Sequence, residues 1–331
     1  MDALTDILKS VQLEGAVYLN AEFRAPWTMR GRYGLVSARQ RLAGAEHVLM
    51  FHFLVEGRCR IRLADGADVF EASAGDLLLF PQDDRHLMGS DLHAPPLDAE
   101  NLNADEQYGG ADVMHFRGGG SGEVTRFVCG YLACSRGTFR PLLDALPRLA
   151  HIPMGDGEAS MLVRELLRVG VRETVAARPG GDLTLARLAE ILFAEALRRH
   201  AERMPASSRG LLAGLRDAHV GRALALMHAE PLHAWTVQEL AARVALSRSA
   251  LAERFGMLVG ETPIQYLARW RLAIAERALR SGRDSIIRIA ERSGYESEAA
   301  FNRAFKREFG LPPATWRRRA APVSGPVSPL R

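Results

Sequence analysis

Cysteine is scarce in this sequence, and no long apolar run is present. The 331 residues include three cysteines, Cys59, Cys129 and Cys134, which are too few and too odd in number for the disulfide scaffold of a secreted protein. The first residues show no basic start followed by an apolar stretch, and nowhere do the ~20 consecutive apolar residues of a membrane span occur. The sequence therefore predicts a cytoplasmic protein with no membrane partner, and it gives no ground to assume a disulfide.

Lysine is almost absent, because only Lys9 and Lys306 are lysines among 43 basic residues. The charges are also unevenly distributed. Residues 222–331 contain 18 Lys and Arg against 10 Asp and Glu, whereas residues 1–221 contain 25 against 29. A basic C-terminal module behind a mildly acidic one is typical of a polyanion-binding domain joined to a regulatory domain. Many basic faces are merely solvated, so charge alone leaves this interpretation open.

The N-terminal half has the pattern of short strands followed by helices. Apolar runs separated by turn residues indicate a small barrel or sandwich. The predicted strands are 47–55, 59–64, 76–81 and 124–134. A long exposed loop is expected from about 91 to 122, and apolar residues at helical spacing predict a hairpin of two helices at 158–175 and 182–203. That hairpin either supplies a dimer face or covers the β domain.

These patterns divide the chain into parts and predict an α+β protein. A mixed domain with strands and a helical hairpin comes first, and an all-α domain follows it. The predicted parts are an N-terminal domain, 1–204; a linker region, 205–221; a helical domain, 222–320; and a disordered tail, 321–331, rich in Pro, Ser and Gly.

An internal repeat dominates the helical domain. A shift of 50 residues pairs Ser247 with Ser297, Phe255 with Phe305, Gly260 with Gly310 and Pro263 with Pro313. Each copy predicts a short helix, a tight turn and a second helix that begins at a Ser cap and ends at Gly. Thr236 and Asp284 are expected to cap the two first helices. Between the copies, 262–282 predicts one continuous connecting helix; a plain helical bundle with a chance repeat is the other interpretation.

Both copies resemble the DNA-binding domain of AraC/XylS-family transcriptional regulators. The second, IIRIAERSGYESEAAFNRAFKREFGLPPATWRR, matches the family signature almost throughout, and the first, WTVQELAARVALSRSALAERFGMLVGETPIQYL, matches as well. The resemblance covers 222–320. It implies two helix-turn-helix units that bind double-stranded promoter DNA, usually as a homodimer, with RNA polymerase as a further partner if the protein is an activator.

Helical geometry predicts which side chains face DNA. In the second copy the polar face consists of Glu298, Ala299, Asn302, Arg303 and Lys306. Arg303 and Asn302 carry the groups that read guanine and adenine edges, whereas Lys306 and the Ser297 cap are expected to hold phosphates.

The first copy has a smaller and less basic face. Its predicted DNA-binding residues are Thr236, Ser247, Arg248, Ser249, Ala252 and Glu253. Glu253 can accept a hydrogen bond from cytosine, but an ordinary solvated surface charge explains it equally well. The second copy is therefore expected to carry most of the base reading.

Residues 47–90 resemble a cupin-type sensor domain, which implies a cupin-like β-barrel. The segment GDLLLFPQDDRHLM (75–88) resembles the second cupin motif and places His86 at its metal-ligand position. The first motif retains only His52 and Glu56, with Leu54 at its other histidine position. A metal-free barrel and a divalent metal or effector site that uses these residues and one further donor both remain open. DNA binding itself requires no cofactor.

The three cysteines admit two interpretations. They are either buried inert thiols or redox sensors, and the first is favoured because no positive charge adjoins them in sequence. Cys129 and Cys134 lie on one predicted strand with opposite orientations, so a bond within that strand is excluded, whereas a bond from either to Cys59 is geometrically open.

The sequence thus favours a transcription regulator without enzymatic activity, whose front domain responds to a small molecule, a metal or an oxidant. Two other functions compete with it. One is a metal-dependent cupin enzyme with a helical appendage, and the other is a nonspecific nucleic-acid packaging protein.

Overall fold

The structure is a computed structural model of the chain, and it forms two compact units. It describes residues 3–10, 14–32, 46–98, 114–134, 142–143, 145–154, 161, 165, 181–205, 207–282 and 284–320. The β unit comprises 13–134 and 146–204, and the helical unit comprises 1–12, 135–145 and 205–331. Two short segments of the predicted N-terminal domain, 1–12 and 135–145, therefore belong to the helical unit.

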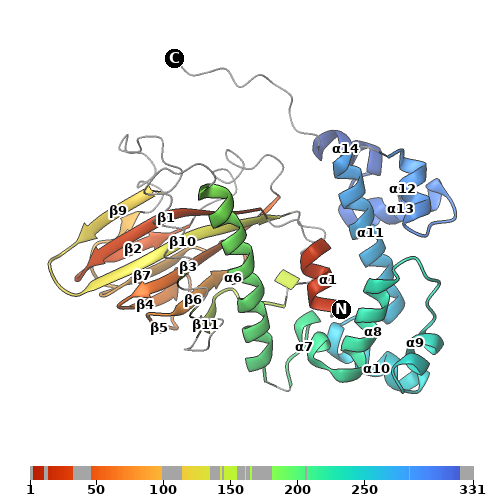
Figure 1. Cartoon of the computed structure of the whole chain (residues 1–331), viewed down its shortest axis with the longest axis horizontal. Helices are drawn as coiled ribbons and strands as arrows, with labels where there is room; N and C mark the ends of the chain where they lie inside the picture. Colours follow the sequence, from red (N-terminus) through yellow and green to blue (C-terminus); the bar gives the residue numbers. More distant parts are fainter. Residues whose placement is uncertain are drawn as a thin grey trace, which may run out of the picture. The chain divides into compact units, whose positions relative to one another are not determined.

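The β unit contains two sheets (Figure 1). Its strands are β1 (Glu14–Arg24), β2 (Thr28–Gly31), β3 (His47–Glu56), β4 (Arg58–Leu63), β5 (Phe70–Ser73), β6 (Asp76–Phe80), β7 (His86–Gly89), β8 (Leu97–Asp98), β9 (Met114–Gly119), β10 (Val124–Cys134) and β11 (Ala150–Pro153). One sheet has the order β11-β6-β3-β10-β1-β9 and the other β5-β4-β7-β2-β8. The expected α+β protein with a cupin-like front domain is confirmed, but its two sheets do not close into one barrel, because no described strand pairs the edges of one sheet with those of the other. The predicted loop from 91 to 122 is partly wrong, since it contains β8 and all of β9.

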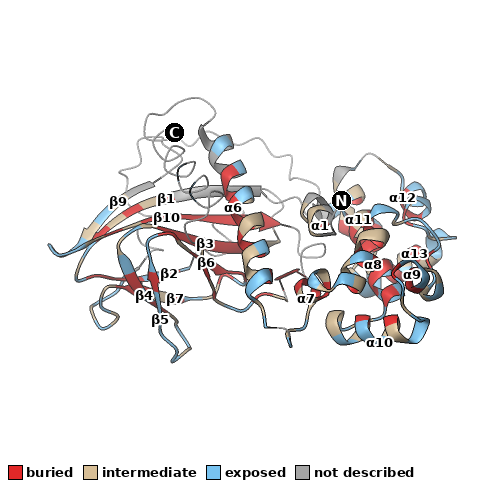
Figure 2. Ribbon diagram, turned by 60° about the horizontal axis from the view of Figure 1, so that its bottom comes forward, coloured by how far each residue is buried: buried red, intermediate tan, exposed pale blue. Residues whose placement is uncertain are grey.

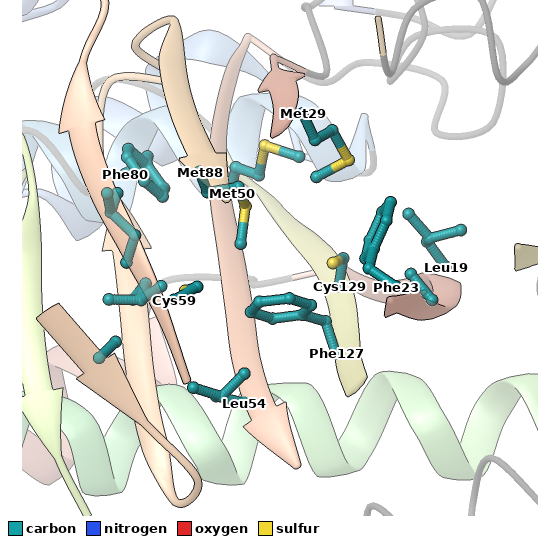
Figure 3. Close-up of a cluster of buried hydrophobic side chains, with 14 of the residues drawn as sticks. Leu19, Phe23, Met29, Met50, Leu54, Cys59, Phe80, Met88, Phe127 and Cys129 are labelled. Atoms are coloured by element: carbon teal, nitrogen blue, oxygen red, sulfur yellow. The ribbon is translucent and has the colours of Figure 1, made fainter. Parts of the chain in front are cut away.

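A dense apolar core fills the space between the two sheets (Figure 3). Met50 and Leu54 of β3 and Phe127 and Cys129 of β10 point into this core, which also receives Met88 from the opposite sheet. Strands that alternate one residue inward and one outward explain this set. The predicted strand pattern identified most of this core without knowledge of the pairing.

The outer face of the six-stranded sheet is covered by helix α6 (Gly181–Arg203), which packs against β1, β10 and β11. Leu192 and Phe193 of α6 are buried, as are Phe51 and Phe53 on the alternate face of β3. Burial on both faces explains why β3 is apolar almost throughout, and Figure 2 shows β3, β6 and β10 as nearly continuous buried strands. The predicted second helix of the hairpin is confirmed as a sheet cover, whereas the first, 158–175, lies almost wholly outside the described residues.

The helical unit contains α1 (Ala3–Ser10), α7 (Leu211–Arg216), α8 (Ala218–Ala229), α9 (Val237–Arg243), α10 (Arg248–Val259), α11 (Pro263–Ser281), α12 (Ile286–Arg292), α13 (Glu298–Phe309) and α14 (Pro313–Ala320). The linker region predicted at 205–221 contains all of α7 and the start of α8. Among the described helices, none has the length and apolar character of a membrane span. The segment 321–331 lies outside the described residues.

Helix α11 is the continuous connector that the sequence predicts. Thr262 caps it in a reciprocal capping box with Gln265, Pro263 occupies its first turn, and Gly282 ends it in the left-handed conformation. The cap predicted for α12 is wrong, because Ser285 rather than Asp284 accepts the hydrogen bond from the Arg288 backbone. The Asp284 carboxylate instead binds Arg292 at 2.8 Å.

Candidate DNA-binding surface and buried histidine pair

Helix α13 has one apolar and one polar face. Phe301 and Phe305 are fully buried, and the ring of Phe305 meets Trp316 of α14 edge-on at 6.1 Å. The opposite face exposes Glu298, Ala299, Arg303 and Lys306 and leaves Asn302 half-buried. Burying the aromatic stripe therefore turns the predicted base-reading residues outward.

The second helices of both copies begin at serine caps. The Ser297 hydroxyl accepts a hydrogen bond from the Ala300 backbone at 3.2 Å, and the Ser247 hydroxyl accepts one from Ala250 at 3.1 Å. Each cap fixes the first turn of its helix and satisfies one backbone donor that a helix terminus otherwise leaves unpaired. The Ser297 hydroxyl proton can still be donated to a phosphate oxygen, whereas the Ser247 hydroxyl also lies 3.2 Å from that of Ser249.

The first copy, α9 with α10, exposes Arg248, Ser249 and Glu253 and leaves Ala252 half-buried. Arg254 also lies on α10, but its guanidinium binds the Asp217 carboxylate at the start of α8 at 2.8 Å. This ion pair neutralises a basic residue of copy one. The second copy, α12 with α13, therefore presents the more basic recognition helix.

Thr236 is confirmed as the cap of α9, because its hydroxyl accepts from the Glu239 backbone at 3.1 Å. The Glu239 carboxylate binds Nε2 of His233 at 2.9 Å rather than the Thr236 backbone N–H that a capping box would give it.

Arg307 is a further basic residue of this surface that was not among the predicted site residues, and it is exposed one residue after Lys306 on α13. Helical spacing places Arg307 four residues after Arg303, on the same side of the helix, and this signal was available from the sequence.

The structure brings His52 and His86 together inside the β unit. Their Nε2 atoms lie 2.9 Å apart, both rings are fully buried, and the His86 ring stacks on Phe80 at 3.7 Å. Nδ1 of His86 donates to the Asp84 carbonyl at 2.9 Å, so the neutral His86 ring accepts at Nε2 and His52 must donate to it. Nδ1 of His52 is then the acceptor for the Cys129 thiol at 2.8 Å. The pair is a saturated hydrogen-bond chain.

This arrangement does not fit the metal of a cupin site. The two Nε2 atoms are hydrogen-bonded to each other, and Glu56 is not with them, because its half-exposed carboxylate binds Arg126. Within the part of the chain that the structure describes, no group of three or more His, Cys, Asp or Glu side chains is placed to hold a metal ion. A divalent metal prefers three or four such donors.

All three cysteines are free thiols and are buried. Burial raises the pKa of Cys59 to about 12 and raises that of Cys129 as well. A thiol reacts with oxidants mainly as the thiolate. The surroundings of Cys59 and Cys129 therefore disfavour the reactive form at neutral pH.

The buried histidines predict a loss of stability in acid. Burial lowers the pKa of His86 from 6.5 to about 4 and lowers that of His52 well below 6.5. The unfolded chain takes up these protons near pH 6.5 while the folded chain resists them, so the stabilisation is complete above that pH and is lost as the pH falls toward 4. For His86 the expected loss is about 3 kcal/mol at about 1.4 kcal/mol for each pH unit between its two pKa values.

Urea unfolding of the wild type and of His86→Gln between pH 7 and pH 4 measures this loss. The variant should be less stable at pH 7 but should lose less stability on acidification, because one of the two protonation sites is gone. Parallel curves for the two proteins would contradict the assignment.

Comparison with known proteins identifies the two halves of the chain. A cupin family model matches residues 2–202, and a helix-turn-helix domain model matches residues 240–319. A putative AraC-like transcription regulator of Streptomyces antibioticus is 33% identical over 97% of this chain and 100% of its own length. The HTH-type transcriptional regulator AlkR of Acinetobacter baylyi is 31% identical over 97% and 100% of the two chains.

Among solved structures, the DNA-binding domain of AdpA in complex with a target DNA matches 31% of this chain and 91% of its own at 31% identity, with a TM-score of 0.29. The cupin model covers nearly all of the β unit, and the helix-turn-helix model lies within the helical unit. The chain belongs to the AraC-like family of DNA-binding transcription regulators, with a cupin-type domain in front of its helix-turn-helix domain.

Proposed function

We propose that this regulator reads its promoter sites mainly through α13, with Arg303 on guanine, Asn302 on adenine and Lys306 on phosphate. The observation that supports this role is the exposed donor-rich face of α13 opposite its buried aromatic stripe. Arg and Asn are the side chains that pair bidentately with guanine and adenine in the major groove. Helix α10, which is less basic, inserts into the neighbouring major groove, about one helical turn or ~34 Å away.

Footprint sequencing of the purified protein on its own genome tests the function. A specific regulator binds its sites roughly 10³-fold or more tightly than random DNA at physiological salt. A smaller ratio, or loss of all site preference in the presence of competitor DNA, would instead indicate nonspecific packaging.

Lys306→Ala should weaken binding to all DNA sequences alike. A lysine on a phosphate supplies attraction without sequence information, and it releases about one counterion on binding. The expected result is an equal loss on specific and scrambled sites, together with a salt slope that falls by about one. Fluorescence anisotropy titrations between low and physiological salt measure both quantities. A loss confined to one base position would contradict the phosphate role.

We further propose that the regulator works in the cytoplasm as a homodimer and that the β unit transmits a signal to the DNA-binding unit. The outer face of α6, where Ile191 is half-exposed, is the part of the β unit proposed for the dimer contact. Sedimentation of the full chain with and without Ile191→Glu tests the dimer.

The proposed signal is an effector other than a resident metal, because the ring nitrogens of His52 and His86 are all engaged in hydrogen bonds. Metal analysis of the purified protein tests this. An activator would also contact RNA polymerase.

A further inference from the structure

Helix α11 is shared by the cores of both helix-turn-helix copies. In its N-terminal half, the Tyr266 ring meets the ring of Phe255 on α10 of copy one edge-on at 5.9 Å, and the Tyr266 hydroxyl meets Nε2 of His228 on α8 at 2.7 Å. In its C-terminal half, Leu272 and Leu279 belong to the buried cluster of copy two. The two cores thus meet along one helix.

Arg271 lies at the junction of these two halves, hydrogen-bonded to the backbone of copy one and close to the turn of copy two. Its Nε donates to the Pro231 carbonyl at 2.6 Å and its Nη2 donates to the His233 carbonyl at 2.8 Å, both in the loop that precedes α9 of copy one. On the other side it lies under Gly294, the left-handed residue in the turn between α12 and α13. A Cβ at Gly294 would lie 3.3 Å from the guanidinium carbon.

These contacts suit a guanidinium. The guanidinium is planar and always charged, and its N–H groups donate in fixed directions. Such charge-assisted hydrogen bonds are stronger and more directional than neutral ones. Gly294 is the residue that allows the turn of copy two to approach that plane closely. A lysine could serve only one of the two carbonyls well, because its ammonium is a point charge.

We propose that Arg271 is a positioning residue that fixes the orientation of copy one relative to copy two. Its guanidinium holds the loop before α9 by two hydrogen bonds and lies close beneath the turn before α13 at Gly294. The two helices α10 and α13 therefore fit their two contact segments on DNA, the contact boxes, at one spacing only. The inference rests on the proposed function, since it assumes that both helices insert into one duplex.

The test compares spacing profiles of the full chain. The probe is a genomic site from the footprint, together with versions that have one or two base pairs added or removed between the two contact boxes. Each base pair turns the second box by roughly a tenth of a helical turn, so the wild type should lose affinity steeply with each change. Arg271→Met should bind the native spacing about tenfold more weakly, because two charge-assisted hydrogen bonds are gone, and its spacing profile should be flat.

Two further variants separate positioning from general damage. Arg269→Met removes the same charge from the same helix but breaks a pair with Glu261, which lies between α10 and α11, so it should keep the wild-type profile. Gly294→Asn introduces a residue that tolerates the left-handed conformation but adds a side chain against Arg271. It should therefore also make the affinity less dependent on the spacing, through a change on the copy-two side of Arg271.

The outcomes distinguish the two claims. If Arg271→Met keeps the wild-type spacing profile, or loses affinity equally for a single box and for the paired boxes, Arg271 does not position the copies. If the wild type itself prefers no genomic site, the proposed function fails before the spacing question arises. Circular dichroism of each variant verifies that the helical unit is folded.

Discussion

Alanine in place of Arg303 should weaken binding at one base pair of the site by ~1–3 kcal/mol, or about 5- to 150-fold. Arg303 is exposed on α13, and the buried Phe301 and Phe305 hold the opposite face of that helix in the core. The guanidinium is therefore exposed, and two of its N–H groups can donate to a guanine edge. The measurement is a set of titrations against a site in which each base pair is changed in turn.

The decisive feature is selectivity. The variant should become indifferent to the base pair that the wild type discriminates most strongly, while other positions keep their effects. Arg307→Ala is the matched control, because it removes the same charge from an exposed position four residues later. Equal losses on all scrambled sites for Arg303→Ala would show that Arg303 contacts phosphate and that the bases are read elsewhere.

Phe301→Ala should destabilise copy two by about 3–5 kcal/mol, because truncating a fully buried aromatic ring removes apolar contact and leaves a cavity. Phe301 has no exposed surface, and its ring packs against Tyr295 at 5.4 Å and Phe305 at 5.5 Å. Urea unfolding followed by the helical circular dichroism signal measures the loss. DNA affinity should fall with it, since Arg303 and Lys306 depend on the same packing for their orientation.

The control for this change is Ile287→Ala on α12. Ile287 is half-exposed, so its truncation should cost well under 1 kcal/mol by the usual behaviour of surface sites. A stability loss for Phe301→Ala no larger than that of the control would mean that the aromatic stripe is not the core of copy two.

The sequence already contained the helix-turn-helix repeat and its exposed face. Serine caps, left-handed glycines and an aromatic stripe at helical spacing act locally, over a few residues, so their effect does not depend on distant parts of the chain. Ser297, Gly310 and the face with Arg303 therefore occur in the structure where the pattern predicts them.

The β unit was less predictable because its arrangement depends on contacts far apart in the chain. The strand pattern located β3, β6 and β10, but a run such as HVLMFHFLVE does not show what covers its second face. That face of the sheet is covered by α6, which follows more than a hundred residues later in the chain. The cupin resemblance implied a cupin-like β-barrel and kept Glu56 with the histidines. The pairing of β10 with β3 instead places Glu56 opposite Arg126, at the exposed end of the sheet.

What the sequence determined by itself is therefore the two copies and the side chains that each second helix turns outward, which follow from short-range spacing, and the resemblance to a family, which rests on the match of the two motifs. Only the tertiary structure decided that His52 hydrogen-bonds to His86 and Cys129, that Arg254 is neutralised by Asp217, and that Arg271 binds the loop before α9 and lies close to the turn of copy two. Each of these contacts joins residues whose separation along the chain carries no periodic signal. Such contacts arise only when apolar burial brings separate elements together.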